Sequence, residues 1–481
     1  MTTVMLSLIS HTNVGKTTLA RTLLRREIGE VRDQPHVTTI AEAHPLIETD
    51  DARLLLWDTP GFGDTVRLMA RLRRERDPIG WFLHQVWDRV VNRPLWCSQE
   101  AVRNVRNEAD VVLYLVNATE DPETAGYLAH ELELLSWMGR PVLVLLNQVG
   151  TEDAVAAVER WRGHLAAFPV TRGVLTLDAF NRAWVEESLV LERVVELLDG
   201  DKRAAMERLL AAWNARNLRV FDQAMAAIAE YLAAIAVDRE PIGSASAAGT
   251  SWIRALSRSE RDRAMSALFD RVQVATRRLM DRLIELHQLA GSSKAQVERR
   301  FEDADLDHLK AMAPTIGGVV GGMTGGLAAG LGADVLAGGM TFGGGAAIGA
   351  LLGALGGAAL GGLYRFAAGG DTAIQFQDAA LDGFARAAVL RYLVVAHYGR
   401  GRGAYADLDH PAQWTAEVDA ELARYRDALH AAWRDAARGG SRATAVLAER
   451  LRRTLGQMVG DLLRRRYPDA RVLAGLAASE P

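Results

Sequence analysis

Cysteine is almost absent from this sequence: Cys97 is the single cysteine in 481 residues. One cysteine excludes an internal disulfide framework and any cysteine-based metal cluster, and it fits a reducing, cytosolic setting. The N-terminus also lacks the order of basic region, apolar core and cleavage site that a signal peptide has, so we expect no such leader.

An excess of positive charge is also missing. The formal net charge is −4 and the isoelectric point is near 6.3, so nothing in the overall composition points to nucleic acid as a partner. Hydrophobic residues make up 49% of the chain, which is ample for a buried core. The length exceeds that of one compact core and predicts two to four domains.

Lysine is scarce, with only four among the 56 basic residues, and one of them stands in a distinctive loop. An apolar run at 4–9 precedes this loop, and a predicted helix at 16–27 follows it. A buried strand, a Gly-Lys-Thr loop and a helix in that order are typical of a phosphate-binding P-loop, in contrast to an ordinary strand-to-helix turn. We predict nucleotide contacts from Ser10, His11, Thr12, Asn13, Val14, Gly15, Lys16, Thr17 and Thr18.

Two residues of this loop have chemical roles in the prediction. Lys16 reaches the outer phosphates, and the hydroxyl of Thr17 holds Mg²⁺. Ser10 occupies the position where the pattern G-x-x-x-x-G-K-[ST] usually has its first glycine. Because the residue is small, we expect strain at Ser10 but not loss of the site.

A second motif follows a predicted strand at 53–57. Asp58-Thr59-Pro60-Gly61 has the spacing D-x-x-G, in which the carboxylate binds Mg²⁺ through water and the glycine N–H meets the γ-phosphate. Upstream, Thr38 and Thr39 end a polar loop, where a hydroxyl can complete the Mg²⁺ shell and sense the terminal phosphate. We therefore predict a GTPase, with Lys16, Thr39 and Gly61 as its catalytic residues.

The region 64–108 is longer than a minimal switch helix. It carries five arginines and then three tryptophans, which permit two interpretations. Either this surface docks on anionic lipid or a partner helix, or it is a solvated amphipathic helix whose tryptophans pack on the domain. The residues concerned are Arg67, Arg71, Arg73, Arg74, Arg76, Trp81, Trp87 and Trp96.

Continuous apolar runs at 110–116 and 141–146 predict central parallel strands, with a helix at 122–138 between them. A last strand at 173–177 and a helix at 183–198 complete a doubly wound, mostly parallel α/β sheet. The base is expected at Asn147, Gln148 and Asp178. GTPases carry N-K-x-D here, and Gly150 replaces the aspartate that reads guanine, although Glu152 and Asp153 are near.

Residues 1–200 thus resemble the Era/TrmE-like branch of the P-loop GTPases at four stations: 10–17, 38–39, 58–61 and the altered 147–150. In that branch a hydrophobic residue often follows D-x-x-G, and here it is Phe62. The resemblance implies slow hydrolysis, because such a side chain cannot orient the attacking water. It also implies that Asn13 can hold a K⁺ ion that substitutes for an arginine finger. The whole chain is similar in layout to bacterial proteins that join an Era-like domain to a C-terminal region of unknown function.

The C-terminal part is predicted to be all-α, with a glycine-rich hydrophobic hairpin at 313–364. Between residues 311 and 364 the only charge is Asp334, and residues 317–362 hold 19 of the 44 glycines. The uncharged segments 314–333 and 341–364 are each long enough to span a bilayer, and their glycines recur every four residues as a glycine zipper. Lys310 and Arg365 place both ends on the cytoplasmic side. Alternatively, the hairpin is buried in the helical bundle or is a flexible linker.

We therefore predict four regions: a G domain at 1–200, a helical region at 201–312, the hairpin at 313–364 and a C-terminal helical region at 365–481. The leading hypothesis is a slow GTPase switch, with Mg²⁺ and K⁺ as cofactors, at the cytoplasmic face of the inner membrane. If the hairpin is buried, the protein is cytoplasmic. The alternatives are a membrane-inserting effector with a nearly inactive nucleotide domain, and an RNA-binding ribosome-assembly GTPase. Expected partners are GTP or GDP, a lipid bilayer, and a second copy or protein bound through the helices, whereas nucleic acid is disfavoured.

Overall fold

The computed structural model divides the chain into two compact units. The first comprises Met1–Arg219, Ala396–Tyr405 and Tyr467–Gly475, and the second comprises Val220–Val395, Ala406–Arg466 and Leu476–Pro481. The residues that the structure describes are 1–25, 41–85, 92–147, 154–177, 183–241, 258–289, 364–366, 373–397, 412–436 and 443–476.

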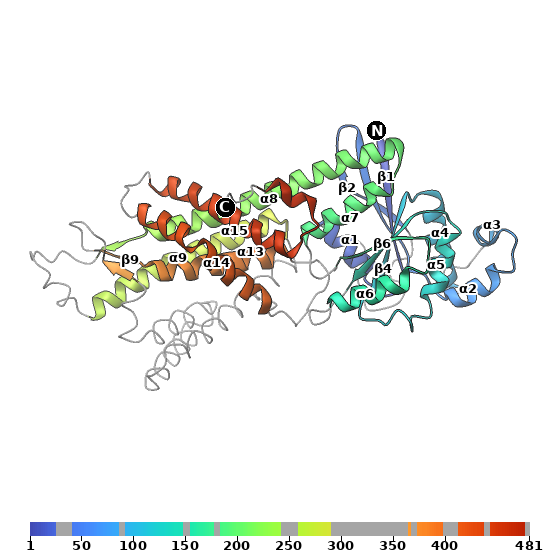
Figure 1. The fold of residues 1–481 in the computed structure, drawn as a ribbon, viewed down its shortest axis with the longest axis horizontal. Helices are drawn as coiled ribbons and strands as arrows, with labels where there is room; N and C mark the ends of the chain where they lie inside the picture. The colour runs from blue at the N-terminus through green and yellow to red at the C-terminus, as the bar shows by residue number, and fades with distance from the viewer. Residues whose placement is uncertain are drawn as a thin grey trace, which may run out of the picture. The chain divides into compact units, whose positions relative to one another are not determined.

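The first unit is built on a six-stranded sheet in the order β2-β3-β1-β4-β5-β6 (Figure 1). All neighbouring pairs are parallel except β2 and β3, which are antiparallel. This confirms the predicted P-loop type of α/β fold with a mostly parallel sheet. The strands are β1 (Thr2–Ser10), β2 (Glu42–Glu48), β3 (Ala52–Asp58), β4 (Val111–Asn117), β5 (Val142–Asn147) and β6 (Thr171–Thr176).

Hydrophobic side chains cover both faces of this sheet, which explains the continuous apolar runs in its central strands. In β4, Leu113 and Leu115 join one core with α1, α7 and the start of α8, whereas Tyr114 and Val116 join the other core with α2 to α6. The helices are α1 (Lys16–Leu24), α2 (Thr65–Leu72), α3 (Pro78–His84), α4 (Arg93–Asn107), α5 (Leu128–Ser136), α6 (Ala154–Leu165) and α7 (Trp184–Glu196). The 3₁₀ turn η3 (Arg471–Gly475) also belongs to this unit.

Two features of this unit differ from the sequence prediction. The strand β2 was not predicted, because Pro45 interrupts its alternation of apolar and polar residues. Its antiparallel pairing with β3 shifts register between Pro45 and Ile47, which is tolerated because β2 is an edge strand. The helix predicted at 122–138 is shorter, since α5 begins at Leu128. Asp121 instead accepts a hydrogen bond from the backbone N–H of Glu123, which favours a turn before the helix.

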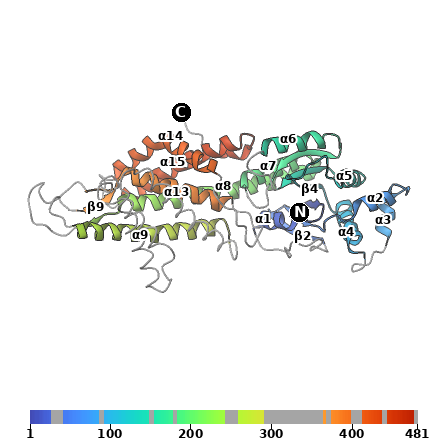
Figure 2. The ribbon, with the colours of Figure 1, turned by 90° about the horizontal axis from the view of Figure 1, so that it is seen from below.

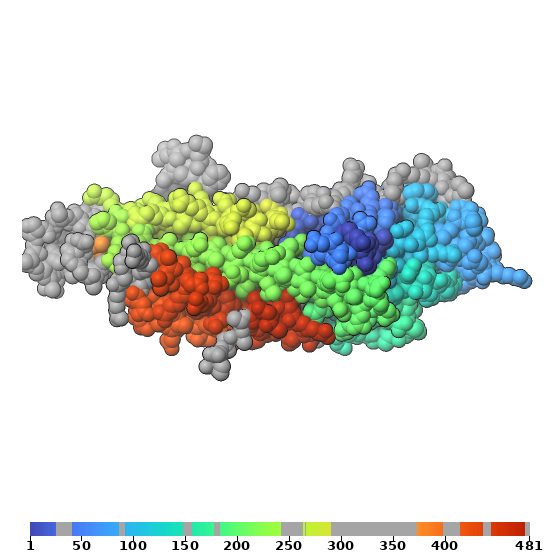
Figure 3. All heavy atoms as spheres, turned by 90° about the horizontal axis from the view of Figure 1, so that it is seen from above, coloured from blue at the N-terminus to red at the C-terminus, as the bar shows by residue number. Residues whose placement is uncertain are grey.

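The second unit is a helical bundle, as predicted (Figure 2). Tyr231 on α8 and Thr276 on α9 share a hydrogen bond of 3.1 Å, and these two helices run side by side in Figure 3. The Tyr425 hydroxyl on α14 donates to Asp461 on α15 at 2.7 Å. The helices are α8 (Gly200–Val237), which begins in the first unit, α9 (Arg258–Leu286), α13 (Asp378–Ala396), α14 (Ala412–Ala436) and α15 (Ala443–Arg466).

A small antiparallel sheet in this unit corrects the all-α prediction. Its order is β7-β9-β8, where β7 is Glu240–Pro241, β8 is Tyr364–Phe366 and β9 is Ala373–Phe376. The sequence predicts only helices in the region 365–481, which contains β9. The run in β9 is too short for periodicity to separate a strand from a buried helix turn, and the contact of Phe376 with Phe269 on α9 fixes it in the core.

The predicted hairpin at 313–364 lies outside the described residues, except that Tyr364 begins β8. Within the described ranges, one helix has the length and composition to cross a membrane, namely α8. Half of its most apolar window is buried, and residues such as Trp213 and Ile228 are core side chains.

Candidate functional site

The loop between β1 and α1 has the backbone of a phosphate-binding loop. Gly15 has φ of +98° and Asn13 has φ of +65°, which turn successive residues inward before α1 begins at Lys16. Ser10, in contrast, remains in β1 without a positive φ, so the strain predicted at this position is not found there. The positive φ angles lie at Asn13 and Gly15, after the strand has ended.

The predicted phosphate ligand, Lys16, is buried in this loop. Its Nζ donates to the Ser10 hydroxyl at 2.8 Å and to the His11 carbonyl oxygen at 3.4 Å. Burial lowers the pKa of Lys16 to about 8, and the carboxylates of Asp58 and Glu131 partly oppose that fall. The serine that replaces the usual glycine therefore supplies a hydrogen-bond acceptor for the lysine.

Asp58 and Thr17 meet at the C-terminal end of β3. The Thr17 hydroxyl donates to Asp58 Oδ2 at 2.8 Å, while Asp58 Oδ1 is buried without a hydrogen-bond partner. Burial raises the pKa of Asp58 to about 6, against the hydrogen bond from Thr17 and the charge of Lys16. A hard divalent cation prefers such an oxygen pair, so both residues fit the predicted Mg²⁺ site. In the part of the chain described, no group of three or more His, Cys, Asp or Glu is placed to hold a metal.

The raised pKa of Asp58 predicts a pH dependence of stability for the nucleotide-free protein. The folded state keeps the Asp58 proton up to about pH 6, whereas the unfolded state loses it near pH 3.8, so the free energy of unfolding falls as the pH rises between these values. At about 1.4 kcal/mol for each pKa unit the fall is about 3 kcal/mol. Urea denaturation of wild type and Asp58→Asn across this range measures it, and the variant should lack this contribution.

Asp51→Asn is the matched control for that comparison. Asp51 is exposed, and the hydroxyl of Thr49 lowers the pKa of its carboxyl, so its contribution to stability has the opposite sign and is lost as the pH falls. If Asp58→Asn has the same pH profile as wild type, Asp58 is not held in a low-dielectric site.

Gly61 approaches the phosphate loop closely. A Cβ at this position would lie 2.9 Å from Lys16 Nζ and 3.1 Å from Thr12 Cα, so only glycine allows the approach. The next residue, Phe62, has an exposed fraction of 0% and packs in the core, and its N–H donates to the Ser10 carbonyl oxygen at 2.9 Å. The side chain after D-x-x-G is therefore a core side chain.

Asn147 lies at the C-terminal end of β5 and braces the phosphate loop. Its Nδ2 donates to the Val14 carbonyl oxygen at 2.8 Å, and its side chain is buried. Seven other predicted or neighbouring positions cannot be placed, because Thr38, Thr39, Gln148, Gly150, Glu152, Asp153 and Asp178 lie outside the described residues. The structure thus brings together the residues predicted to bind phosphate and Mg²⁺ at Ser10 to Thr18, Asp58 and Gly61.

The long region after D-x-x-G forms α2, α3 and α4. Trp81 is half-buried and packs against the core, as in the interpretation without a lipid partner, whereas Trp87 is outside the described residues. Arg67 pairs with Asp64 at 3.3 Å, and Arg73 bonds to Glu133 on α5. The positive charge of this surface is therefore partly neutralised by neighbouring carboxylates.

Glu131 on α5 was not among the predicted site residues. Leu128, Glu131 and Leu135 recur at helical spacing, which places the glutamate on the buried face and was the available signal. Its carboxylate contacts His11, at 2.7 Å from Nδ1, and the Tyr114 hydroxyl, at 2.7 Å. His11 thus bonds to a buried carboxylate in addition to forming part of the phosphate loop.

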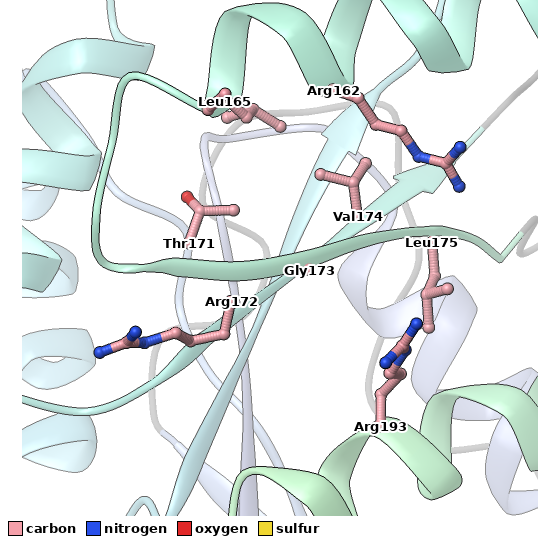
Figure 4. A pocket seen from close by; sticks show the side chains of 9 residues that line it. Arg162, Leu165, Thr171, Arg172, Gly173, Val174, Leu175 and Arg193 are labelled. Carbon is pink, nitrogen blue, oxygen red and sulfur yellow. The ribbon is translucent and has the colours of Figure 1, made fainter.

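A surface hollow of about 570 Å³ lies along β6, away from these residues (Figure 4). Arg162, Arg172 and Arg193 line it. Two of the three are already neutralised, since Arg162 pairs with Glu159 at 2.8 Å and Arg193 with Glu196 at 2.5 Å. We assign no chemistry to it.

Comparisons with known proteins agree with this geometry. A family model described as 50S ribosome-binding GTPase matches residues 6–148. The chain is 21% identical over 186 residues to GTPase Era of Clostridium tetani, covering 39% of this chain and 54% of the relative. It is 27% identical over 199 residues to GTPase Der of Stenotrophomonas maltophilia, covering 40% and 34%. The chain spans about half the length of the Era relatives it matches.

Among solved structures, Era in complex with MgGDPNP and a 16S ribosomal RNA segment is similar at 17% identity and a TM-score of 0.32, covering 42% of this chain and 58% of that one. The family model and the Era and Der relatives show that residues 6–148 form a P-loop GTPase domain of Era/Der type. A second family model, described as a domain of unknown function (DUF3482), matches residues 168–457, which is more than half of the chain. The chain belongs to this family, with the GTPase domain at its N-terminal end.

Proposed function

We propose that this protein binds GTP, hydrolyses it slowly and acts as a switch at the cytoplasmic face of the inner membrane. The proposal of nucleotide binding rests on one observation: four residues lie together at one end of the parallel sheet, namely Lys16, Thr17, Asp58 and Gly61. Lys16 holds the outer phosphates, and Gly61 presents its backbone to the γ-phosphate. Thr17 and Asp58 would hold Mg²⁺, with Thr38 and Thr39 as the further ligands predicted from the sequence, and the ion would neutralise phosphate charge.

Slow hydrolysis follows from the position of Phe62. Its side chain is buried, so no group directly after D-x-x-G can orient the attacking water. Asn13 is exposed in the phosphate loop. It is proposed to hold K⁺, whose positive charge would substitute for that of an arginine finger. Turnover that rises with K⁺ over Na⁺ in wild type, but not in Asn13→Ala, tests this assignment.

The base-reading loop leads to a prediction of weak base selectivity. Because Gly150 replaces the acid that accepts two guanine N–H donors, GTP should be preferred over ATP by less than is usual for a GTPase. Gly150→Asp should raise the GTP to ATP affinity ratio about 10-fold or more, measured by competition binding. Gly126→Asp is the control, because this glycine is exposed with no atom within 4 Å of a Cβ. Strong GTP selectivity in wild type would mean that Glu152 or Asp153 reads guanine instead.

The membrane part of the proposal rests on residues 311–364, in which Asp334 is the only charge. In water an interior glycine costs a helix about 1 kcal/mol relative to alanine, so a helix with this composition needs lipid or tight packing. Flotation of the full chain with liposomes of anionic and neutral lipid, in GDP and in GDPNP, is the direct test. Failure to float in every nucleotide state would reject membrane action.

A second candidate is a ribosome-assembly GTPase. The observation that favours it is the family description of residues 6–148, 50S ribosome-binding GTPase. The opposing observation is the net charge of −4, without a compact basic RNA module in the sequence. Co-sedimentation with isolated 50S and 30S subunits, in the same two nucleotide states, separates the candidates.

A further inference from the structure

Glu131 is a buried carboxylate at which the phosphate loop, the segment after D-x-x-G and the sheet meet. Its side chain has an exposed fraction of 0%. Oε1 lies 2.7 Å from His11 Nδ1 and accepts a longer hydrogen bond of 3.4 Å from the Thr65 hydroxyl at the start of α2. Oε2 accepts from the Tyr114 hydroxyl on β4 at 2.7 Å. Both carboxylate oxygens are therefore engaged by groups from three different elements.

Burial destabilises the ionised carboxylate of Glu131 and so raises its pKa, although the hydrogen bonds from His11 and Tyr114 oppose that rise. A leucine on the same helix face would pack without that cost, as Leu128, Leu132 and Leu135 do. The carboxylate is thus explained by the polar contacts it makes and not by packing of the core.

The His11 contact ties Glu131 directly to the phosphate site. The His11 carbonyl oxygen accepts from Lys16 Nζ, and His11 forms a parallel β-bridge with Phe62, the residue after Gly61. The His11 ring stacks on Tyr127 with centroids 4.3 Å apart, which fixes its orientation. Thr65 lies four residues beyond Gly61 along the chain. A shift of the Glu131 side chain would therefore move both sides of the γ-phosphate position.

We infer that Glu131 is a positioning residue for GTP hydrolysis, whose carboxylate couples the phosphate loop through His11 to the segment after D-x-x-G through Thr65. This coupling keeps Lys16 and Gly61 in register around the γ-phosphate. It rests on the proposed function and adds the residue that links the nucleotide to α2 and α5. We expect the coupling to affect GTP more than GDP, because Gly61 is the residue that the D-x-x-G spacing assigns to the γ-phosphate, which GDP lacks.

The test uses the full chain and three variants. Glu131→Gln keeps the side-chain size but removes the charge that faces His11, and Thr65→Val removes the contact to α2. Tyr114→Phe is the matched control, because it deletes a hydrogen bond to the same carboxylate without touching the loop or α2. Single-turnover GTP hydrolysis, and the affinities for GDPNP and GDP, are measured on each variant, with thermal melting as a check of folding.

Glu131→Gln is expected to slow hydrolysis at least 10-fold and to weaken GDPNP at least 10-fold, while its GDP affinity stays within threefold of wild type. Thr65→Val should act in the same direction, and the double variant should be no worse than Glu131→Gln. Tyr114→Phe should change hydrolysis less than threefold even if it lowers the melting temperature. A merely structural role predicts instead that Tyr114→Phe and Glu131→Gln slow hydrolysis alike, and that result overturns the coupling.

Wild-type data distinguish failure of the coupling from failure of the proposed function. If wild type binds and hydrolyses GTP, and Glu131→Gln does so equally well, the coupling is refuted and the proposed function stands. Wild type that binds no guanine nucleotide refutes the proposed function and the coupling with it.

Discussion

Lys16→Ala is expected to lower the affinity for both GTP and GDP about 100-fold or more. Lys16 is the cation that the phosphate loop presents, and its Nζ already contacts two loop oxygens from within the site. Hydrogen bonds to a charged group contribute roughly 1.5 to 3 kcal/mol each, so loss of two such bonds to phosphate accounts for a change of this size. Isothermal calorimetry on the full chain measures it.

The fold should survive this substitution. Burial already disfavours the charged form of Lys16, as its pKa of about 8 shows, so removal of the ammonium group relieves a desolvation cost. Lys202→Ala is the matched control. Lys202 is one of the four lysines, lies on α8 and forms an ion pair with Asp110, so its loss should leave nucleotide affinity unchanged. Equal affinity in wild type and Lys16→Ala would end the GTPase interpretation.

The sequence predicts the neighbourhood of Lys16, Thr17 and Asp58 where the spacing of the motifs determines it. A strand, a Gly-Lys-Thr loop and a helix must form a P-loop, and a second strand ending in Asp58 must lie beside it once the sheet is parallel. The pairing of Thr17 with Asp58, separated by 41 residues, follows from those two motifs. Local sequence and topology agree here, so the prediction needs no knowledge of packing.

Contacts that depend on packing were not predicted. Glu131 lies 120 residues from His11, and no motif links the two positions. The strands β2 and β9 were missed because Pro45 interrupts one alternating pattern and the other has only four residues. Ser10 was expected to be strained in place of glycine, but it remains in the strand and accepts a hydrogen bond from Lys16 instead. Glu131 therefore depends on a partner 120 residues away, whereas Ser10 bonds to Lys16 only six residues away.

Arginine substitutions in the predicted hairpin at 313–364 have the other large expected effect. Insertion in lipid and burial in the protein predict different results for the same substitutions. If both segments span a bilayer, wild type should stay with membranes during carbonate extraction. Replacement of Leu351 and Leu355 by Arg should then move the protein to the soluble fraction, since each arginine costs roughly 2.5 to 3.5 kcal/mol at the centre of a membrane helix. The two together cost about 5 to 7 kcal/mol on the same scale, which exceeds a 1,000-fold change in partition.

Val446→Arg is the control for that pair. Val446 lies in the first turn of α15 and its exposed fraction is 71%, so an added charge there should change neither compartment nor stability. Burial of the hairpin within the protein predicts a different result: Leu351→Arg and Leu355→Arg would lower the melting temperature without a change of compartment. Gly321→Leu and Gly325→Leu disrupt close helix contact in both settings and do not discriminate. Complete release of wild type by carbonate would reject the constitutive span, and the absence of liposome binding in both GDP and GDPNP would reject a nucleotide-triggered insertion as well.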